Sequence, residues 1–358
     1  MQVQEASSIV GICLTIGVLA LLFGLLIRPI NAGPAIFHGR KQKEEAHRPA
    51  STRNLTCRAP ALGAAASYLP HKLLVQSLAP TQLPFCIFLH DIMHDNFISH
   101  NLARSGRLQP AEERFIQRSI ESVLSQQSGP VHVLDVGGNI GYMALFAASI
   151  SKRIRVTTIE PHPWHRRLLE ASIALNGWGE RMRVEPVIVT SQPEPPTCIY
   201  VADPANGGVT ELKPGATHTD CTALGGSMVE STTIDLLLKA SPFGQGVDVL
   251  KIDVEGAEGL ALAGATDMMR HPPRFVCMEW IGFRHLKIRP SVDPVDWLER
   301  TFPRRSWRWA INKREHLTQE QVHATIHNWR NGKSKPKAPT SFYNGGDLEL
   351  TLRGRHRR

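Results

Sequence analysis

Two short stretches of the sequence concentrate residues that can do chemistry, and the first of them is KIDVEGAEG at 251–259. It places Lys251, Asp253 and Glu255 at alternate positions, directly after an apolar run. Side chains alternate along a strand, so these three charged groups are expected on one face. A central parallel strand is normally apolar on both faces, so such charges fit only at its carboxyl end, where open α/β sheets bind ligands.

The second stretch is DVGGNIGY at 135–142, a glycine turn between an apolar run and residues at helical spacing. A dinucleotide-binding turn requires a second glycine where Asn139 stands, counted from Gly137. No Gly-Lys-Ser/Thr closes the turn as in a phosphate-binding loop, and Asp135 at its start would repel a phosphate. The turn therefore favours a ligand that is cationic or carries hydroxyl groups.

These stretches need a parallel sheet to bring them together. Strand, glycine turn and helix form one α/β unit, and a helix at 164–176, closed by Gly177, belongs to the next unit. The sequence predicts an α/β fold with helices on both faces of the sheet. The predicted strands are 131–136, 155–160, 183–190, 247–254 and 274–280, followed by a hairpin pair at 309–312 and 347–352.

Seven motifs follow one another along the chain: VLDVGGNIGY, IEPHP, ALNGW, NGGVTEL, TTIDLLL, KIDVEGAE and FVCMEW. In these motifs the chain resembles the FkbM-type, S-adenosylmethionine-dependent methyltransferases, and the resemblance covers about 95 to 353. It implies S-adenosylmethionine as the cofactor and a class I methyltransferase fold, which is a Rossmann-like, seven-stranded, mostly parallel sheet with helices on both faces.

The resemblance assigns cofactor-binding roles at the strand ends. Asp135 is expected to meet the polar amino-acid end of the cofactor, and Glu160 is expected to accept both ribose hydroxyls. Glycines in the turn let a small molecule lie against the backbone. The expected cofactor-binding residues are Asp135, Gly137, Gly138, Asn139, Gly141, Glu160 and Asp253.

Asp253, Glu255 and Lys251 are the expected catalytic residues. Asp253 is the leading acid, and either carboxylate can take the acceptor's proton or orient the acceptor. Lys251 is expected to lower their pKa or to pair with one of them. Glu258 is assigned to the start of the next helix. No metal is expected, although carboxylates that include Glu279 leave a Mg²⁺ site as the alternative.

The expected activity is methyl transfer to oxygen, on a hydroxyl of a sugar or secondary metabolite. The acceptor is thus a small molecule or a glycan, and no specific nucleic acid is expected as a partner. Two alternatives stay open: a membrane-tethered scaffold without catalysis, and an N-methyltransferase. The carboxylates of the DVEG stretch disfavour the second.

An apolar run at 9–27 without charge is long enough to span a bilayer, and it predicts a retained signal-anchor helix rather than a cleaved signal peptide. We divide the chain into five parts. They are a membrane segment (1–30), a stalk or linker (31–83), a substrate-side lead-in region with helices (84–130), the methyltransferase domain (131–353) and a basic tail (354–358).

The charges after the span favour a cytosolic body by the positive-inside rule, whereas a glycosylation sequon at Asn54 requires a lumenal one. We expect free thiols at Cys198 and Cys221, with a bridge between them as the alternative for a lumenal body.

Residues 283–358 hold 17 Lys and Arg against 7 Asp and Glu, so this basic C-terminal segment is a candidate for contact with anionic lipid.

Overall fold

The computed structural model describes residues 57, 74–77, 79, 81–92, 94–203, 206–279, 294–303, 306–311, 314–315 and 347–352. The chain divides into two units, Met1–Arg53 and Asn54–Arg358, and only the second contains described residues. The predicted membrane span at 9–27 lies outside them. Among the helices that are described, none has the length and apolarity to cross a bilayer.

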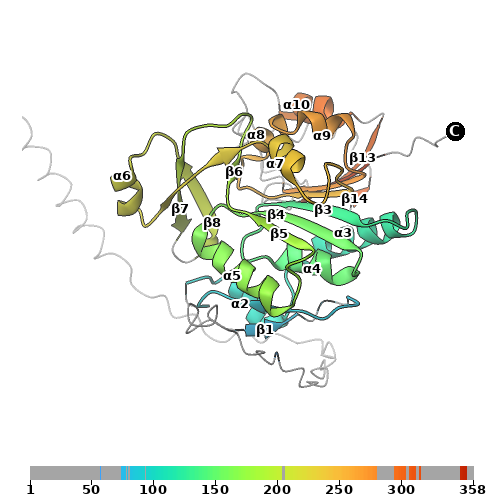
Figure 1. The fold of residues 1–358 in the computed structure, drawn as a ribbon, viewed down its shortest axis with the longest axis horizontal. Coiled ribbons are helices and arrows are strands. Elements are labelled where there is room, and N and C mark those ends of the chain that lie inside the picture. Colours follow the sequence, from blue (N-terminus) through green and yellow to red (C-terminus); the bar gives the residue numbers. More distant parts are fainter. Residues whose placement is uncertain are drawn as a thin grey trace, which may run out of the picture. The chain divides into compact units, whose positions relative to one another are not determined.

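A mixed eight-stranded sheet forms the centre of the second unit (Figure 1). Its five strands β3, β4, β5, β11 and β12 are parallel, and β15, β13 and β14 extend it as antiparallel neighbours. The order is β14-β13-β15-β12-β11-β3-β4-β5. The bounds are Val131–Val136 (β3), Ile154–Ile159 (β4), Met182–Glu185 (β5), Val249–Ile252 (β11), Phe275–Glu279 (β12), Trp307–Ile311 (β13), Arg314–Glu315 (β14) and Asp347–Leu352 (β15).

The parallel core and the antiparallel β13–β15 pair confirm the predicted strands, with two corrections. The two-residue β14 makes the sheet eight-stranded rather than seven-stranded. The predicted strand at 183–190 is two strands, because Pro186 between them lacks an N–H for a ladder. Only β5 joins the main sheet, while β6 (Ile188–Val189) pairs in parallel with β10 (Ser231–Thr232) in a separate sheet.

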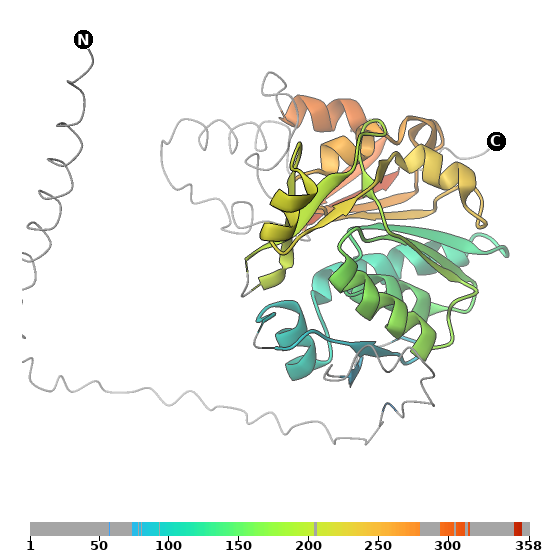
Figure 2. The ribbon, with the colours of Figure 1, turned by 60° about the vertical axis from the view of Figure 1, so that its left-hand side comes forward.

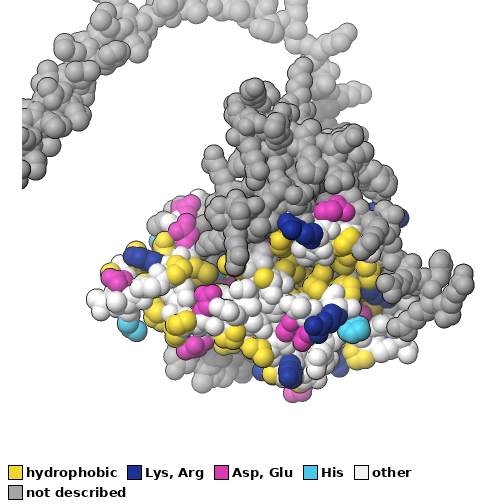
Figure 3. All heavy atoms as spheres, turned by 90° about the horizontal axis from the view of Figure 1, so that it is seen from above, with side chains coloured by type: hydrophobic (Ala, Val, Ile, Leu, Met, Phe, Trp, Pro, Cys, Tyr) yellow, Lys and Arg dark blue, Asp and Glu magenta, His cyan; other side chains and the backbone are white. Residues whose placement is uncertain are grey.

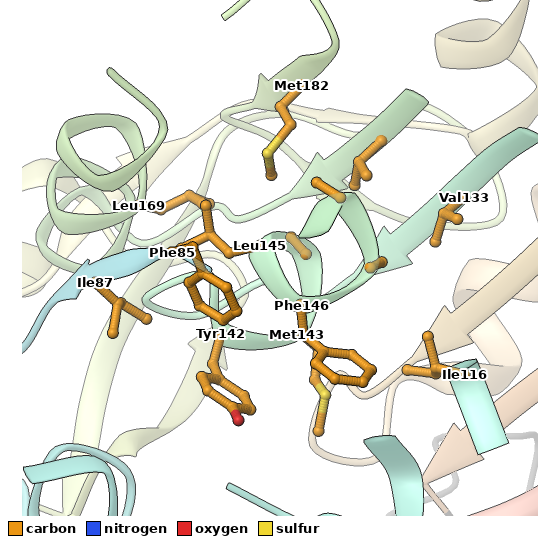
Figure 4. Close-up of a cluster of buried hydrophobic side chains, with 14 of the residues drawn as sticks. Phe85, Ile87, Ile116, Val133, Tyr142, Met143, Leu145, Phe146, Leu169 and Met182 are labelled. Carbon is orange, nitrogen blue, oxygen red and sulfur yellow. The ribbon is translucent and has the colours of Figure 1, made fainter. Parts of the chain in front are cut away.

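Helices cover both faces of the main sheet, and each face has its own apolar core. One core includes Val131 and Val133 from β3, with α3, α4 and α5; Figure 4 shows Phe85 beside Tyr142 in it, ring centroids 5.9 Å apart. The other core includes Leu134 and residues of α7, α8 and α9. The bounds are Pro110–Leu124 (α3), Tyr142–Ile150 (α4), Pro163–Leu175 (α5), Ile234–Ala240 (α7), Glu258–Ala263 (α8), Thr266–Arg270 (α9) and Pro294–Thr301 (α10).

The folded body begins before residue 84. β1 (Leu74–Gln76) pairs antiparallel with β2 (Cys86–Phe88), and α2 (Ile98–Ser105) follows. A disulfide joins Cys57 to Cys86, and the Phe88 N–H donates to Ser172 Oγ on α5. Part of the predicted linker at 31–83 is therefore built into the body.

An insertion between β6 and β10 forms a second, antiparallel sheet of order β8-β7-β9. In Figure 1 it projects to the side of the main sheet together with α6. Its elements are β7 (Thr197–Asp203), β8 (Asn206–Lys213), α6 (His218–Ala223) and β9 (Ser227–Val229). Cys198 on β7 and Cys221 on α6 are disulfide-bonded, so the expectation of two free thiols was wrong: α6 packs on β7 and brings the two sulfurs together.

Candidate functional site

A cavity of about 330 Å³ lies at the carboxyl ends of β3, β4, β11 and β12. This is the edge at which polar residues were expected to meet. Most of the predicted site residues line it: Gly137, Gly138, Asn139, Glu160, Lys251, Asp253 and Glu255. Asp135 and Gly141 do not line it, and the structure gives both a supporting place behind the cavity.

The glycine turn after β3 passes very close to neighbouring chain segments. The N–H groups of Gly137 and Gly138 both donate to the carbonyl of Ile159, at 3.0 and 2.9 Å. Gly137 has a φ of +89°, and a Cβ there would stand 1.7 Å from the carbonyl oxygen of Asp253. Glycine is required here because both the conformation and the contact exclude a side chain. Gly141 starts α4, where a Cβ would meet Leu169 at 2.2 Å.

Glu160 follows β4 and ties the glycine turn to the start of α5. One carboxylate oxygen accepts from the N–H of Asn139 at 2.7 Å, and the other accepts from the N–H of His162 at 2.8 Å. His165 Nδ1 lies 3.6 Å from the same carboxylate. Burial disfavours the charge of Glu160, but His165 and these backbone donors outweigh it and hold the pKa of Glu160 below its usual value. Glu160 therefore offers the cavity an ionised carboxylate.

Lys251 and Asp135 form a buried ion pair across the β11–β3 register, with Lys251 Nζ 3.4 Å from Asp135 Oδ1. Lys251 Nζ also lies 3.3 Å from Asp253 Oδ2 and donates to the Gly137 carbonyl at 3.2 Å. Burial opposes the charge of Lys251, but the two aspartates raise its pKa well above the usual value. Asp135 also accepts from Thr158 on β4. Lys251 thus joins two strand ends to the glycine turn.

Asp253, Glu255 and Glu279 gather at the cavity, with one carboxylate oxygen of each within 4.8 Å of the others. Burial and then the charge of Asp253 raise the pKa of Glu279 to about 11, and the two side chains share a hydrogen bond. Burial by itself would raise the pKa of Asp253, but the charge of Lys251 and the hydrogen bond with Glu279 outweigh burial, so this pKa lies below its usual value. Glu279 is therefore a protonated acid that donates to ionised Asp253.

Glu255 reaches the cavity by a turn rather than along the strand. β11 ends at Ile252, short of the predicted 254, and Glu255 has a φ of +53° followed by Gly256 at +92°. Burial, then the charges of Asp253 and Glu258, raise the pKa of Glu255 to about 7. A non-glycine residue in this conformation is costly, and such strain clusters at functional sites. The turn therefore places a carboxylate that titrates near neutrality in the cavity.

Glu258 supports this turn from the first position of α8. Its Oε1 accepts from the N–H groups of Val254 and Gly256, at 3.2 and 3.1 Å. The structural role expected for Glu258 is confirmed, although its partners lie in the turn before the helix rather than in the helix itself. Glu258 is buried and does not line the cavity.

Sequence reasoning did not name the residues of the remaining wall of the cavity. Part of this wall comes from the α2–α3 region, inside the range 84–130 expected on the substrate side, and part comes from the inserted sheet, in which β7 and β8 form a hairpin. Its signal in the sequence is the short alternation of Thr210 and Leu212 with outward polar residues, which is too brief to predict a strand. The lining residues from these regions are Phe97, Ile98, Leu108, Gln109, Ile199, Asn206, Thr210 and Leu212.

Comparison with known proteins identifies one family. Residues 135–297 match the family model described as the methyltransferase FkbM domain. No curated protein sequence matches the chain.

Two solved structures are among those found similar to this chain. An O-methyltransferase from Bacillus cereus in complex with SAH is 14% identical, with a TM-score of 0.34, over 74% of this chain and 92% of that one. A TehB-like SAM-dependent methyltransferase from Corynebacterium glutamicum is 10% identical, with a TM-score of 0.34, over 71% and 94%.

Proposed function

This chain carries an FkbM methyltransferase domain at residues 135–297 and uses S-adenosylmethionine, and on that premise we propose that it methylates a hydroxyl group of a sugar or secondary metabolite. The observation that carries the choice of oxygen is the group of Asp253, Glu255 and Glu279 at the cavity. A hydroxyl must lose its proton as it is methylated, and a carboxylate that titrates near neutrality is suited to take it.

The residues present fit the cofactor. The backbone of the glycine turn lines the cavity without side chains in the way, and Glu160 keeps lone pairs free beyond its two backbone donors. We assign Gly137, Gly138 and Asn139 to contact with the amino-acid part, and Glu160 to the ribose hydroxyls. Asp135 acts behind them, because its carboxylate is bound to Lys251 and Thr158 rather than turned to the cavity.

In the proposed reaction each residue of the acid group has its own task. When bound, S-adenosylmethionine supplies an electrophilic methyl group on a sulfonium centre. Glu255 accepts the hydrogen bond of the acceptor hydroxyl and takes its proton as the methyl group is transferred. Burial and then ionised Asp253 beside it raise the pKa of Glu255 and so make it a stronger base. Glu279 keeps Asp253 in place through the shared hydrogen bond. Lys251 neutralises Asp253 and Asp135 and holds the glycine turn.

Calorimetric titration of the full chain with S-adenosylhomocysteine tests the cofactor assignment. Glu160→Ala removes a charged hydrogen-bond acceptor and is expected to weaken binding about 10- to 100-fold. Glu180→Ala, at an exposed position outside the cavity, is the matched control and should leave binding unchanged. A chain that binds no cofactor would support the scaffold alternative instead, whereas one that binds it equally well without the Glu160 carboxylate would refute the assignment of Glu160 to the ribose.

We also propose that residues 9–27 anchor the protein in a membrane and that the folded body faces an oxidising compartment. Two disulfides in the described residues support the second point, because cytosolic thiols are kept reduced. The sequon at Asn54 agrees with a lumenal or extracellular body, whereas the charges after the span favour the cytosol. The proposed contact of residues 283–358 with anionic lipid rests on their charge alone.

A further inference from the structure

The inserted sheet forms one wall of the cavity and is anchored at several points. It leaves the main body after β6 and returns at β10, and these two strands pair in parallel. Within it, the disulfide between Cys198 and Cys221 ties β7 to α6. A small core of Ile188, Ile199 and Val229 joins it to β6. The wall is therefore a built element of the cavity.

The two faces of this sheet differ in polarity. Ile199 on β7 lies opposite Leu212 on β8, and both line the cavity together with Thr210. On the other face, the Tyr200 hydroxyl donates to Glu211 at 2.8 Å, where both side chains meet solvent. Alternation along β8 thus turns Thr210 and Leu212 inward and Glu211 outward. An apolar surface faces the space in which an acceptor must lie.

The α2–α3 region continues this apolar surface. Phe97, Ile98 and Leu108 line the cavity, and Phe97 is 50% exposed. Asp95 fixes the chain here, since its carboxylate accepts from the N–H groups of Phe97 and Ile98 at 3.3 and 3.0 Å. An isolated bridge between Asp95 and Asn206 links this region to the start of β8. The two apolar parts therefore meet at one side of the cavity.

The charged groups that line the cavity are mostly acids. Glu160 and Asp253 are ionised and Glu255 titrates near neutrality, whereas Glu279 keeps its proton and is uncharged. Against them stands Lys251, whose charge is already shared between Asp135 and Asp253. The lining contains no arginine among the described residues. An acceptor with a phosphate, sulfate or carboxylate would meet like charges here, and the described lining offers it no cation that does not already face an acid.

We propose that the acceptor is an uncharged molecule that lays an apolar face on Ile199 and Leu212 and turns its hydroxyl to the acid group. This inference rests on the proposed methyl transfer and narrows it to neutral acceptors with apolar surface. The inserted sheet is then the part of the chain that selects the acceptor, while the main sheet holds the cofactor and the acids.

A matched pair of probes tests the role of charge. Benzyl alcohol and 4-(hydroxymethyl)benzoate differ by one carboxylate, and their binding to the full chain saturated with S-adenosylhomocysteine can be followed by saturation-transfer NMR. We expect benzyl alcohol to bind at least about tenfold more tightly. Transfer of a labelled methyl group to each probe gives a second readout. Equal or tighter binding of the benzoate, or no binding of either probe, would overturn the inference.

Variants of β8 test the role of the inserted sheet. Leu212→Asp places a charge on the inner face and should weaken benzyl alcohol binding about tenfold. Thr210→Lys should reverse the preference and favour the benzoate, because it adds an unpaired cation to the inner face of β8. Glu211→Gln, on the outer face of the same strand, is the control and should change neither. Unchanged selectivity in both inner-face variants, with the fold verified by circular dichroism, would refute the proposal.

The two proposals fail separately. A chain that does not bind S-adenosylhomocysteine at all refutes the methyltransferase function. A chain that binds it, yet prefers the anionic probe, refutes only the inference about the acceptor.

Discussion

Three carboxylates whose oxygens lie within 4.8 Å of one another cannot all be ionised without a compensating charge. In this protein two causes resolve the conflict. Glu279 keeps its proton and donates to Asp253, and Lys251 stands 3.3 Å from the Asp253 carboxylate. What remains is Glu255, whose pKa of about 7 lets it exchange a proton near neutral pH. The three neighbouring acids therefore differ in charge at neutral pH: Asp253 is ionised, Glu279 is protonated, and Glu255 is partly ionised.

The pH dependence of methyl transfer should follow Glu255. A general base must be deprotonated, so kcat/KM is expected to rise as the pH increases through about 7 and then to level off. Glu255→Gln should lower kcat about 100-fold or more and remove this rise. Glu230→Gln, an exposed substitution, serves as the control. A pH profile that keeps its rise in Glu255→Gln would assign the base to another residue.

Metal removal should have little effect on the reaction. The same three acids are the group in the described residues that could hold an ion, but Lys251 already balances Asp253 and the proton on Glu279 removes one ligand charge. We expect the rate of methyl transfer to stay within about twofold after dialysis against EDTA and after addition of Mg²⁺. A loss of activity that Mg²⁺ restores would establish the metal site that the sequence left as an alternative.

At the scale of elements, the register of β3 and β11 decides how the site is held. Lys251 lies opposite Asp135, so the charged pair links the central two strands at their carboxyl ends. Both side chains are almost fully buried. A buried pair of this kind adds little stability compared with apolar residues, but loss of one partner leaves an uncompensated charge inside the protein.

Lys251→Met should therefore destabilise the fold by about 3–5 kcal/mol, measured as the free energy of unfolding in urea. Adding Asp135→Asn to this variant removes one of the stranded charges and should restore part of the loss. Lys239→Met, at an exposed position on α7, should stay within about 0.5 kcal/mol of the parent. Equal stability of Lys251→Met and the parent would show that the pair does not hold the strand ends together.

The elements that local sequence patterns determine could be predicted, whereas those that depend on contacts between separated segments could not. The parallel strands and the placing of Lys251, Asp253 and Glu160 at one edge follow from apolar runs and from the geometry of parallel sheets. The turn that places Glu255 could not be predicted, because alternation along a strand was assumed past Ile252. The inserted sheet was missed because the alternation in β7 and β8 is brief, and because β9 pairs with β7 across the intervening β8 and α6. The bridge between Cys198 and Cys221 was only an alternative, because sequence alone does not give the connectivity of cysteines.

At the scale of the whole molecule, the charge of +9 does not gather on the described part of the face seen in Figure 3. Basic, acidic and hydrophobic side chains are interspersed on the described part of this face (Figure 3). In the view turned by 60°, the olive elements of the insertion lie to the left of the green part of the main body (Figure 2). The described body thus offers no basic surface on this face, and its compartment is better judged from its cysteines than from its charge.

The cysteines of the described residues make a definite prediction about that compartment. When the full chain is unfolded in denaturant, maleimide should label the buried Cys277. It should label the four bridged cysteines only after a reductant is added; these are Cys57, Cys86, Cys198 and Cys221.

A lumenal body should also be protected from protease in sealed membrane vesicles, and a glycosidase should lower its mass by removing a glycan at Asn54. Substitution Asn54→Gln is the matched control, since it should abolish the mass change without touching either disulfide. Cysteines that label without reductant, in a body that protease digests in intact vesicles, would instead favour the cytosolic orientation that the charges near residues 9–27 predict.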